Sequence, residues 1–328
     1  MCCAAQLEAV RQRAQVEFDC PVLLDTVTPA ANQGGPVMNI QTKPITDITS
    51  LYAAVRKAKR EFTGQVWWRG QRDYAWPLRP SLFRSPTGYD ERSAILRFKQ
   101  RAFSRHPNLP TTLDLPSWLF LAQHYRLPTR LLDWTESPLI ATFFACEQDE
   151  CHINHSDLIP DADGALFALS PYRLNEVQVG KQGLLMPEDQ QCLACLAPAF
   201  NENAQESARV IAIRPSEVDV RLMVQISEFT LSGYDVALED LDKSAQFIIK
   251  FRVDQETKVA LRGELKRLGI RLSSIFPDLE HLAEEITHVG FNKPKQNQAD
   301  SEEHGPAETG QSATWSELTT GAVEGDSG

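Results

Sequence analysis

The apolar residues of this chain are gathered in short segments, and this most constrains its fold. Segments such as GALFALSP (164–171) and RVIAIRP (209–215) are typical of buried strands, because they are brief and bounded by Gly or Pro. Segment 91–105 instead has helical spacing. We therefore expect the α/β class (mixed α+β): a single body with a mixed β-sheet flanked by helices. None of these segments approaches the roughly 18–20 apolar residues that cross a membrane, so no membrane partner is expected.

The composition divides the chain into three parts. Residues 1–37 combine an amphipathic helix with a Pro- and Gly-containing linker, and residues 38–291 form the expected body. Residues 292–328 are acidic and contain few apolar residues. Such a segment cannot bury enough apolar surface to offset the entropy cost of ordering, so we expect this tail to be disordered.

Charge and cysteine content limit the class of protein. The formal net charge is −11, from 33 Lys and Arg against 44 Asp and Glu, which argues against coating nucleic acid by bulk charge. The seven cysteines and the absence of a secretory signal favour reduced thiols and a cytoplasmic location. Cys192 and Cys195 have CxxC spacing, but their apolar surroundings favour buried thiols, so no metal is expected.

Polar residues stand beside the expected strands. Arg69 ends the apolar strand GQVWWRGQ next to Gly70, where we expect a sharp turn. An arginine there can bind a phosphate or carboxylate through two hydrogen bonds, or it can pair structurally with Asp133. His124, at the end of an expected helix, is suited to acid–base work, although a favourable contact with the helix dipole explains it equally well.

Three sequence blocks resemble the FRG domain, named for its aromatic-Arg-Gly motif. The motif here is Trp68-Arg69-Gly70, within WRGQRDYAWPLRPSLFR (68–84). The second block is LAQHYRLPTRLLDWTESPLIATFFA (121–145), and the third is RLMVQISEFT (221–230). The resemblance implies little chemistry, because the family is largely uncharacterised. A bacterial stress, toxin or phage-defence role is consistent with it.

The order of these blocks is also similar to that of ADP-ribosyltransferases. In that family an Arg or His on the first strand holds NAD, a Ser-Thr-Ser block supports the pocket, and a late Glu stabilises the oxocarbenium-like centre. The resemblance gives these roles to Arg69, to Asp133-Trp134-Thr135 with Ser137, and to Gln225 or Glu228, although the chain lacks a Ser-Thr-Ser triplet. NAD would be a substrate, and Trp68 or Trp134 would stack on its nicotinamide. The candidate catalytic residues are Arg69, His124, Asp133, Gln225 and Glu228, and the candidate ligand-binding residues are Trp68, Gly70, Gln71, Arg130, Thr135 and Ser137.

The alternative is a non-catalytic module that binds a nucleotide, another anionic small molecule or nucleic acid and signals to a partner. Segment 67–84 interleaves arginines with aromatic residues, a pattern that can hold single-stranded nucleic acid. The competing interpretation is that these aromatic side chains pack on the sheet. The sequence leaves open whether the chain is an enzyme and what its oligomeric state is.

Overall fold

The computed structural model describes residues 43–85, 87–105, 109–147, 162–214 and 225–288. The predicted N-terminal helix and linker, the predicted disordered tail and the start of the third sequence block lie outside the described residues. Contacts divide the chain after Glu285, and the account below concerns the unit that ends there.

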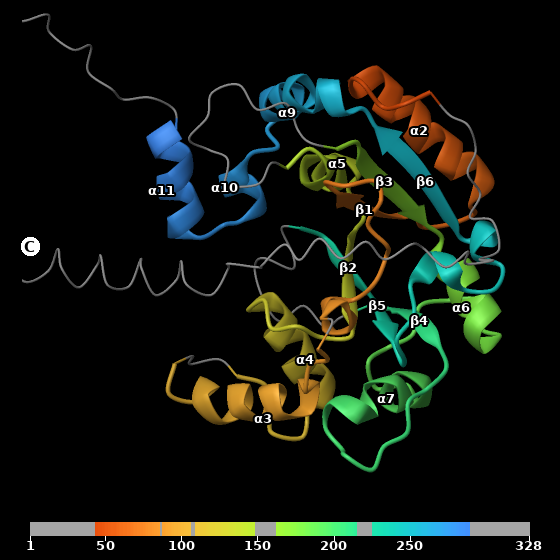
Figure 1. Ribbon diagram of the computed structural model, residues 1–328, viewed down its shortest axis with the longest axis vertical. Coiled ribbons are helices and arrows are strands. Elements are labelled where there is room, and N and C mark those ends of the chain that lie inside the picture. Colours follow the sequence, from red (N-terminus) through yellow and green to blue (C-terminus); the bar gives the residue numbers. More distant parts are fainter. Residues whose placement is uncertain (1–42, 86, 106–108, 148–161, 215–224, 289–328) are drawn as a thin grey trace, which may run out of the picture. The chain divides into compact units, whose positions relative to one another are not determined.

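A six-stranded sheet forms the centre of the fold (Figure 1). The strand order is β4-β5-β2-β1-β3-β6, and every pairing between described strands is antiparallel. Parallel pairing occurs in two isolated bridges, Ile45 with Val253 and Leu185 with Ile213. The prediction of a helix-flanked sheet in an α/β body is confirmed. The strands are β1 (Trp67–Gln71), β2 (Leu131–Thr135), β3 (Gly164–Leu169), β4 (Val210–Ile213), β5 (Ser227–Ser232) and β6 (Ile248–Val253).

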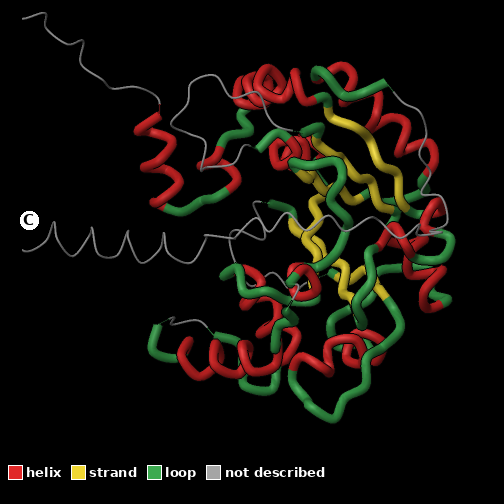
Figure 2. The backbone as a smooth tube through the Cα atoms, in the orientation of Figure 1, coloured by secondary structure: helices red, strands yellow, loops and turns green. Residues whose placement is uncertain are grey.

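Figure 2 shows the helices (red) around the strands (yellow). Several helices begin at a side chain that accepts a hydrogen bond from the first turn, namely Asp47, Asp90, Asp114 and Ser137. The helices are α2 (Ile48–Glu61), α3 (Glu91–Ala102), α4 (Leu115–His124), α5 (Pro138–Ala145), α6 (Pro171–Val179), α7 (Gln190–Leu196), α9 (Lys258–Arg267), α10 (Leu272–Ile275) and α11 (Leu279–His288), with short 3-10 turns at Ser81–Arg84, Ala197–Ala199, Leu238–Asp240, Ser244–Gln246 and Gln255–Thr257.

Two groups of helices cover one face of the sheet. Helices α2, α5 and α9 pack in one hydrophobic cluster with β1, β3 and β6. Helices α3, α4 and α7 pack in a second cluster with β2, β4 and β5. The opposite face of the sheet packs against α6 and the segment that precedes β6. On the first face the core is therefore built in two halves that meet at the boundary between β1 and β2, whereas the cluster on the opposite face continues across this boundary.

Strands β1 and β2 are paired at a single position in the described sheet. Trp68 pairs with Thr135, whereas β1 pairs with β3 from Trp67 to Gln71 and β2 pairs with β5 along its whole length. Beyond Trp68 the two strands diverge. The sheet thus splits at its centre, between the two halves of the core.

Gly70 lies inside β1, so the predicted turn at this glycine is wrong. A Cβ atom at this position would lie 1.8 Å from the carbonyl oxygen of Ala141 and 2.6 Å from the amide nitrogen of Ala145. Both atoms belong to the backbone of α5 and cannot move aside. Glycine is required here because α5 packs directly on the backbone of β1.

We expect Gly70→Ala to destabilise the protein by about 3 kcal/mol or more, because the added methyl group pushes α5 away from the sheet. Gly263→Ala is the matched control. Gly263 lies within α9, and a Cβ there meets no atom within 4 Å, so this variant should gain about 0.5–1 kcal/mol. Denaturant unfolding measures both changes, and equal stability of the two variants would contradict the packing argument.

Candidate functional site

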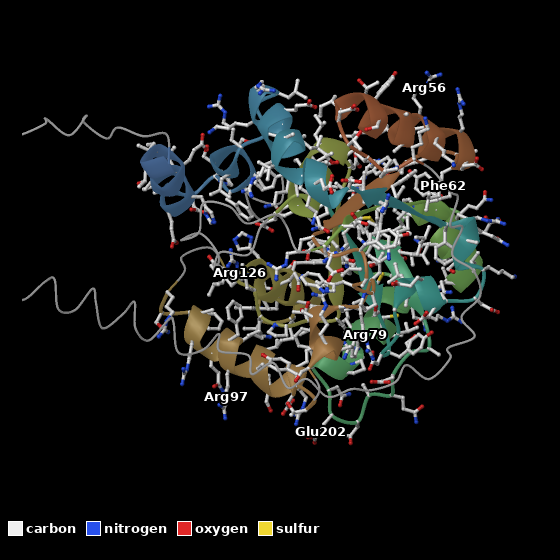
Figure 3. All side chains as sticks on the ribbon, turned by 45° about the horizontal axis from the view of Figure 1, so that its top comes forward. Arg56, Phe62, Arg79, Arg97, Arg126 and Glu202 are labelled. Carbon is white, nitrogen blue, oxygen red and sulfur yellow. The ribbon has the colours of Figure 1, made fainter. Side chains whose placement is uncertain are left out.

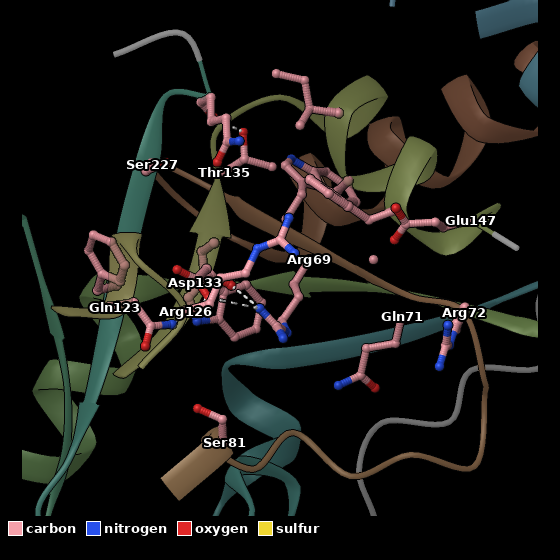
Figure 4. Close-up of a pocket in the computed structure, with 18 of the residues that line it drawn as sticks. Arg69, Gln71, Arg72, Ser81, Gln123, Arg126, Asp133, Thr135, Glu147 and Ser227 are labelled. Atoms are coloured by element: carbon pink, nitrogen blue, oxygen red, sulfur yellow. Dashed lines mark hydrogen bonds and ion pairs between the residues drawn. The ribbon is translucent and has the colours of Figure 1, made fainter. Parts of the chain in front are cut away.

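A cavity of about 470 Å³ lies where the sheet splits (Figure 4). It is lined by β1, β2, the start of β5, the end of α4, α5 and the segment that follows β1. Its size is typical of small-molecule sites. Eight of the eleven predicted residues line this cavity, namely Trp68, Arg69, Gly70, Gln71, His124, Asp133, Thr135 and Gln225, whereas Arg130, Ser137 and Glu228 do not.

Arg69 crosses the gap between the two strands. Its Nη1 donates a hydrogen bond of 2.6 Å to the backbone carbonyl of Asp133, and it lies 3.9 Å from Oδ2 of the same residue. The side chain is 17% exposed, and its buried Nε has no hydrogen-bond partner in the described part of the chain. Burial lowers the pKa of Arg69 to about 10, which leaves the guanidinium charged at neutral pH. A buried donor without a protein partner beside a cavity is available to a ligand that binds there.

The cavity is positively charged within an acidic chain. Its lining contains the four arginines Arg69, Arg72, Arg84 and Arg126 and the two carboxylates of Asp133 and Glu147, a formal charge of +2. The chain as a whole carries −11. The Arg69 side chain is mostly buried, whereas Arg84 and Arg126 are exposed. An anion in the cavity would therefore be attracted by one charge that water screens little and by others that water screens more strongly.

Arg126 is a residue that the sequence analysis missed (Figures 3 and 4). It follows α4 with φ of +62°, a left-handed position that glycine normally fills after a helix. Its guanidinium lines the cavity and makes no hydrogen bond or ion pair with another described residue. An arginine thus occupies a strained backbone position beside the cavity, a feature that recurs at functional sites.

Asp133 is held by a short chain of hydrogen bonds. Thr129 Oγ1 donates to Gln123 Oε1 over 2.6 Å, and Gln123 Nε2 donates to Asp133 Oδ2 over 2.8 Å. Neither Gln123 nor Thr129 was predicted as part of the site. The sequence does place Gln123 beside His124, but nothing in it shows that this glutamine turns toward β2.

Thr135 and Gln225 meet at the end of the cavity nearest β5. Thr135 Oγ1 donates to the backbone carbonyl of Gln225 over 2.6 Å, and Gln225 Nε2 donates to the carbonyl of Ile275. Ile226 has φ of +47°, which is strained for a β-branched residue. Ser137 stays outside the cavity because its hydroxyl caps α5 by accepting a hydrogen bond from the amide of Ile140.

Arg130 is buried in the core, where it forms an ion pair, and it does not line the cavity. Its Nε donates to Glu91 Oε2 over 2.8 Å, and its Nη1 donates to the carbonyl of Cys195. The Arg130 and Glu91 side chains are 5% and 4% exposed. This ion pair joins α3 to β2, so the predicted ligand contact of Arg130 is replaced by a structural one.

Glu228 does not line the cavity, although its neighbours Ser227 and Phe229 do. Successive side chains of a strand point to opposite faces, and Glu228 points to the face on which Arg214 and Glu136 lie. Arg214 donates hydrogen bonds to both Glu228 and Glu136 there. Burial, with a smaller contribution from Glu136, raises the pKa of Glu228 to about 7 against the opposing effect of Arg214.

The aromatic residues divide between core and cavity mouth. Trp68 is 1% exposed and stacks on Phe251, and the indole of Trp134 donates to Thr230 on the other face. Both side chains line the cavity, but each is almost fully buried and packed against its neighbours. Trp76 is 39% exposed beside Arg72, whose guanidinium lies 4.9 Å from its ring centre. Because most aromatic side chains of segment 67–84 are committed to packing, the pattern gives little support to single-stranded nucleic acid.

The thiols predicted to be buried are buried. Cys192 and Cys195 are residues of α7 and belong to the second hydrophobic cluster. Burial raises the pKa of Cys192 to about 12. Among the described residues, no group of three or more His, Cys, Asp or Glu side chains could hold a metal ion.

Comparison with known families supports the resemblance found in the sequence. Residues 64–153 match the family model of the FRG domain. The match includes β1, β2 and all four arginines of the cavity, whereas Gln225 and Ser227 fall outside it. The comparisons with curated proteins and with solved structures gave no match. No helix of the described residues is both long enough and apolar enough to cross a membrane.

We expect the stability of the protein to fall as the pH rises from about 5 to 8, in part because of Glu228. Its carboxyl titrates near 4.5 when unfolded and near 7 when folded, so the folded state binds the proton more tightly between these values. Deprotonation of Glu228 over this pH range then lowers the free energy of unfolding by on the order of 2 kcal/mol. Denaturant unfolding at several pH values measures this, and Glu228→Gln should flatten the curve. Parallel curves for the two proteins would exclude Glu228 as the source.

Proposed function

Because the chain contains an FRG domain, we propose that the arginine-lined cavity between β1 and β2 is this protein's ligand site and binds an anionic small molecule, with a nucleotide such as NAD as the best candidate. The observation that carries this proposal is the placement of Arg69. It stands in the gap of the sheet, largely desolvated, with a buried donor that no described residue accepts.

The other groups of the cavity support a ligand larger than a single phosphate. Three further arginines surround the space, and Trp76 offers an exposed aromatic face at its edge. Gln71 and Gln123 add amide groups. A nucleotide combines the features that these groups recognise, namely phosphates for guanidinium groups and a base for aromatic and amide contacts.

We expect calorimetry to detect binding of NAD or ATP by the wild type, and weaker binding by two arginine variants. Arg69→Lys keeps the charge but removes the planar fork, so affinity should fall about tenfold or more. Arg126→Gly should weaken binding as well while leaving stability equal or higher, because glycine relieves the left-handed strain at this position. Arg97→Lys, on the outer part of α3 and away from the cavity lining, is the matched control. If no anion, including a short oligonucleotide, binds to the wild type, the proposal fails.

A second candidate function is transfer of ADP-ribose from NAD. Strands β1, β2 and β5 lie in one sheet, and Arg69 of β1, Thr135 of β2 and Gln225, two residues before β5, line the same cavity. Cleavage of the glycosidic bond needs mainly a fixed polar group near the developing positive charge. Gln225 rather than Glu228 is the candidate for that role, since Glu228 faces away. A toxin or defence role would follow from the consumption of NAD.

Incubation of the full chain with labelled NAD and a cell lysate tests this activity. We expect transfer of label to protein or release of nicotinamide by the wild type, and a loss of at least tenfold in Arg69→Ala and in Gln225→Ala. Glu228→Gln, on the far face, should keep the activity. Nucleotide binding without any turnover would leave the binding module as the function.

A further inference from the structure

We infer that Asp133 selects the ligand of the cavity by accepting a hydrogen bond from a sugar hydroxyl, so that the ligand is a nucleotide with a free ribose diol. This inference rests on the proposed function. It adds the substrate class: the site would prefer NAD to NADP, and either to a bare pyrophosphate.

The first observation is that the carboxylate is held in one orientation. The Thr129 hydroxyl accepts a hydrogen bond from the amide of Leu131 and has one proton to give, which goes to Gln123 Oε1. Because that oxygen is occupied, the amide of Gln123 must turn its Nε2 toward Asp133 Oδ2. Thr129 is fully buried, so its position is fixed by the core. Threonine and glutamine are thus positioning residues for the aspartate.

The second observation is that one carboxylate oxygen remains available. Asp133 Oδ2 accepts from Gln123, whereas Oδ1 accepts no hydrogen bond from any described residue. The side chain is 52% exposed and lines the cavity (Figure 4). A carboxylate accepts hydrogen bonds and cannot donate them, so it recognises a ligand group with a proton to donate.

The third observation concerns charge. A carboxylate among four arginines repels a phosphate that approaches it, so it weakens a site for a bare anion. A ligand whose hydroxyl groups stand a few bonds from its phosphates satisfies both kinds of group. An acidic side chain on a ribose hydroxyl is the usual way in which proteins accept NAD and exclude the 2′-phosphate of NADP.

The competing explanation is that Asp133 only neutralises Arg69. Asp133 does form an ion pair of 3.9 Å with Arg69 and acts electrostatically on Arg84, but the hydrogen bond of Arg69 goes to the backbone carbonyl of Asp133 and not to its carboxylate. Asp133→Asn therefore keeps the direct contact of Arg69 and removes only the charge of the side chain.

The test is calorimetry of the full chain with NAD, NADP and inorganic pyrophosphate. We expect the wild type to bind NAD at least tenfold more tightly than NADP, and Asp133→Asn to reduce this preference at least threefold. Thr129→Val should shift the preference in the same direction, because Gln123 loses the donor that orients it. Thr142→Val is the matched control, since Thr142 is an equally buried threonine whose hydroxyl bonds within α5. A melting curve of each variant verifies that it is folded.

The outcomes separate the inference from the proposed function. Equal binding of NAD and NADP by the wild type, or an unchanged preference in Asp133→Asn, would overturn the inference and leave the nucleotide site in place. Binding of pyrophosphate without binding of NAD would overturn the inference and leave an anion site. A wild type that binds none of the three ligands would overturn both.

Discussion

The hydrogen bond from Arg69 to the carbonyl of Asp133 stands where a strand pairing would otherwise be. Strands β1 and β2 share the single pair Trp68 and Thr135, and beyond it the guanidinium spans the space between the two backbones. A backbone carbonyl at an unpaired strand edge needs a donor, and the arginine supplies one while it keeps its charge next to the cavity. The Arg69 side chain therefore both bridges the two strands and contributes a positive charge to the cavity.

On one face of the sheet, the hydrophobic core is divided at the same place as the sheet. Each half has its own helices and its own hydrophobic cluster, and the cavity lies at the seam between them. Groups from both halves reach the seam: Gln123, His124 and Arg126 come from the end of α4, whereas Phe144 and Glu147 come from α5 and its end. A molecule bound in the cavity would contact both halves at once.

The segments of β1, β3 and β4 were predicted from the sequence, because short apolar segments bounded by Gly, Pro or polar residues carry a strong signal, whereas no strand was predicted at β6. Helices over 91–105 and ending near His124 were also predicted, but the capping residues Asp90, Asp114 and Ser137 were not identified. The site was harder to predict. The sequence brought Arg69, Asp133 and Gln225 together correctly as a group that lines one cavity, but it could not exclude Arg130, whose partner Glu91 lies 39 residues away. The face of β5 that Glu228 occupies depends on strand register, which local pattern does not fix when both faces of the strand are buried.

The aromatic-Arg-Gly motif can now be divided by physical cause. Trp68 is buried against β6, and Gly70 is glycine because the backbone of α5 leaves no room for a side chain. Trp68 and Gly70 are thus explained by packing, and Arg69 is the position of the motif that offers a polar side chain to the cavity. In this chain, the tryptophan and the glycine set how closely β6 and α5 pack on β1, and the arginine is the part of the motif that is left for the cavity. The remaining polar character of the opening is set by residues outside the motif, among them Arg126 and Asp133.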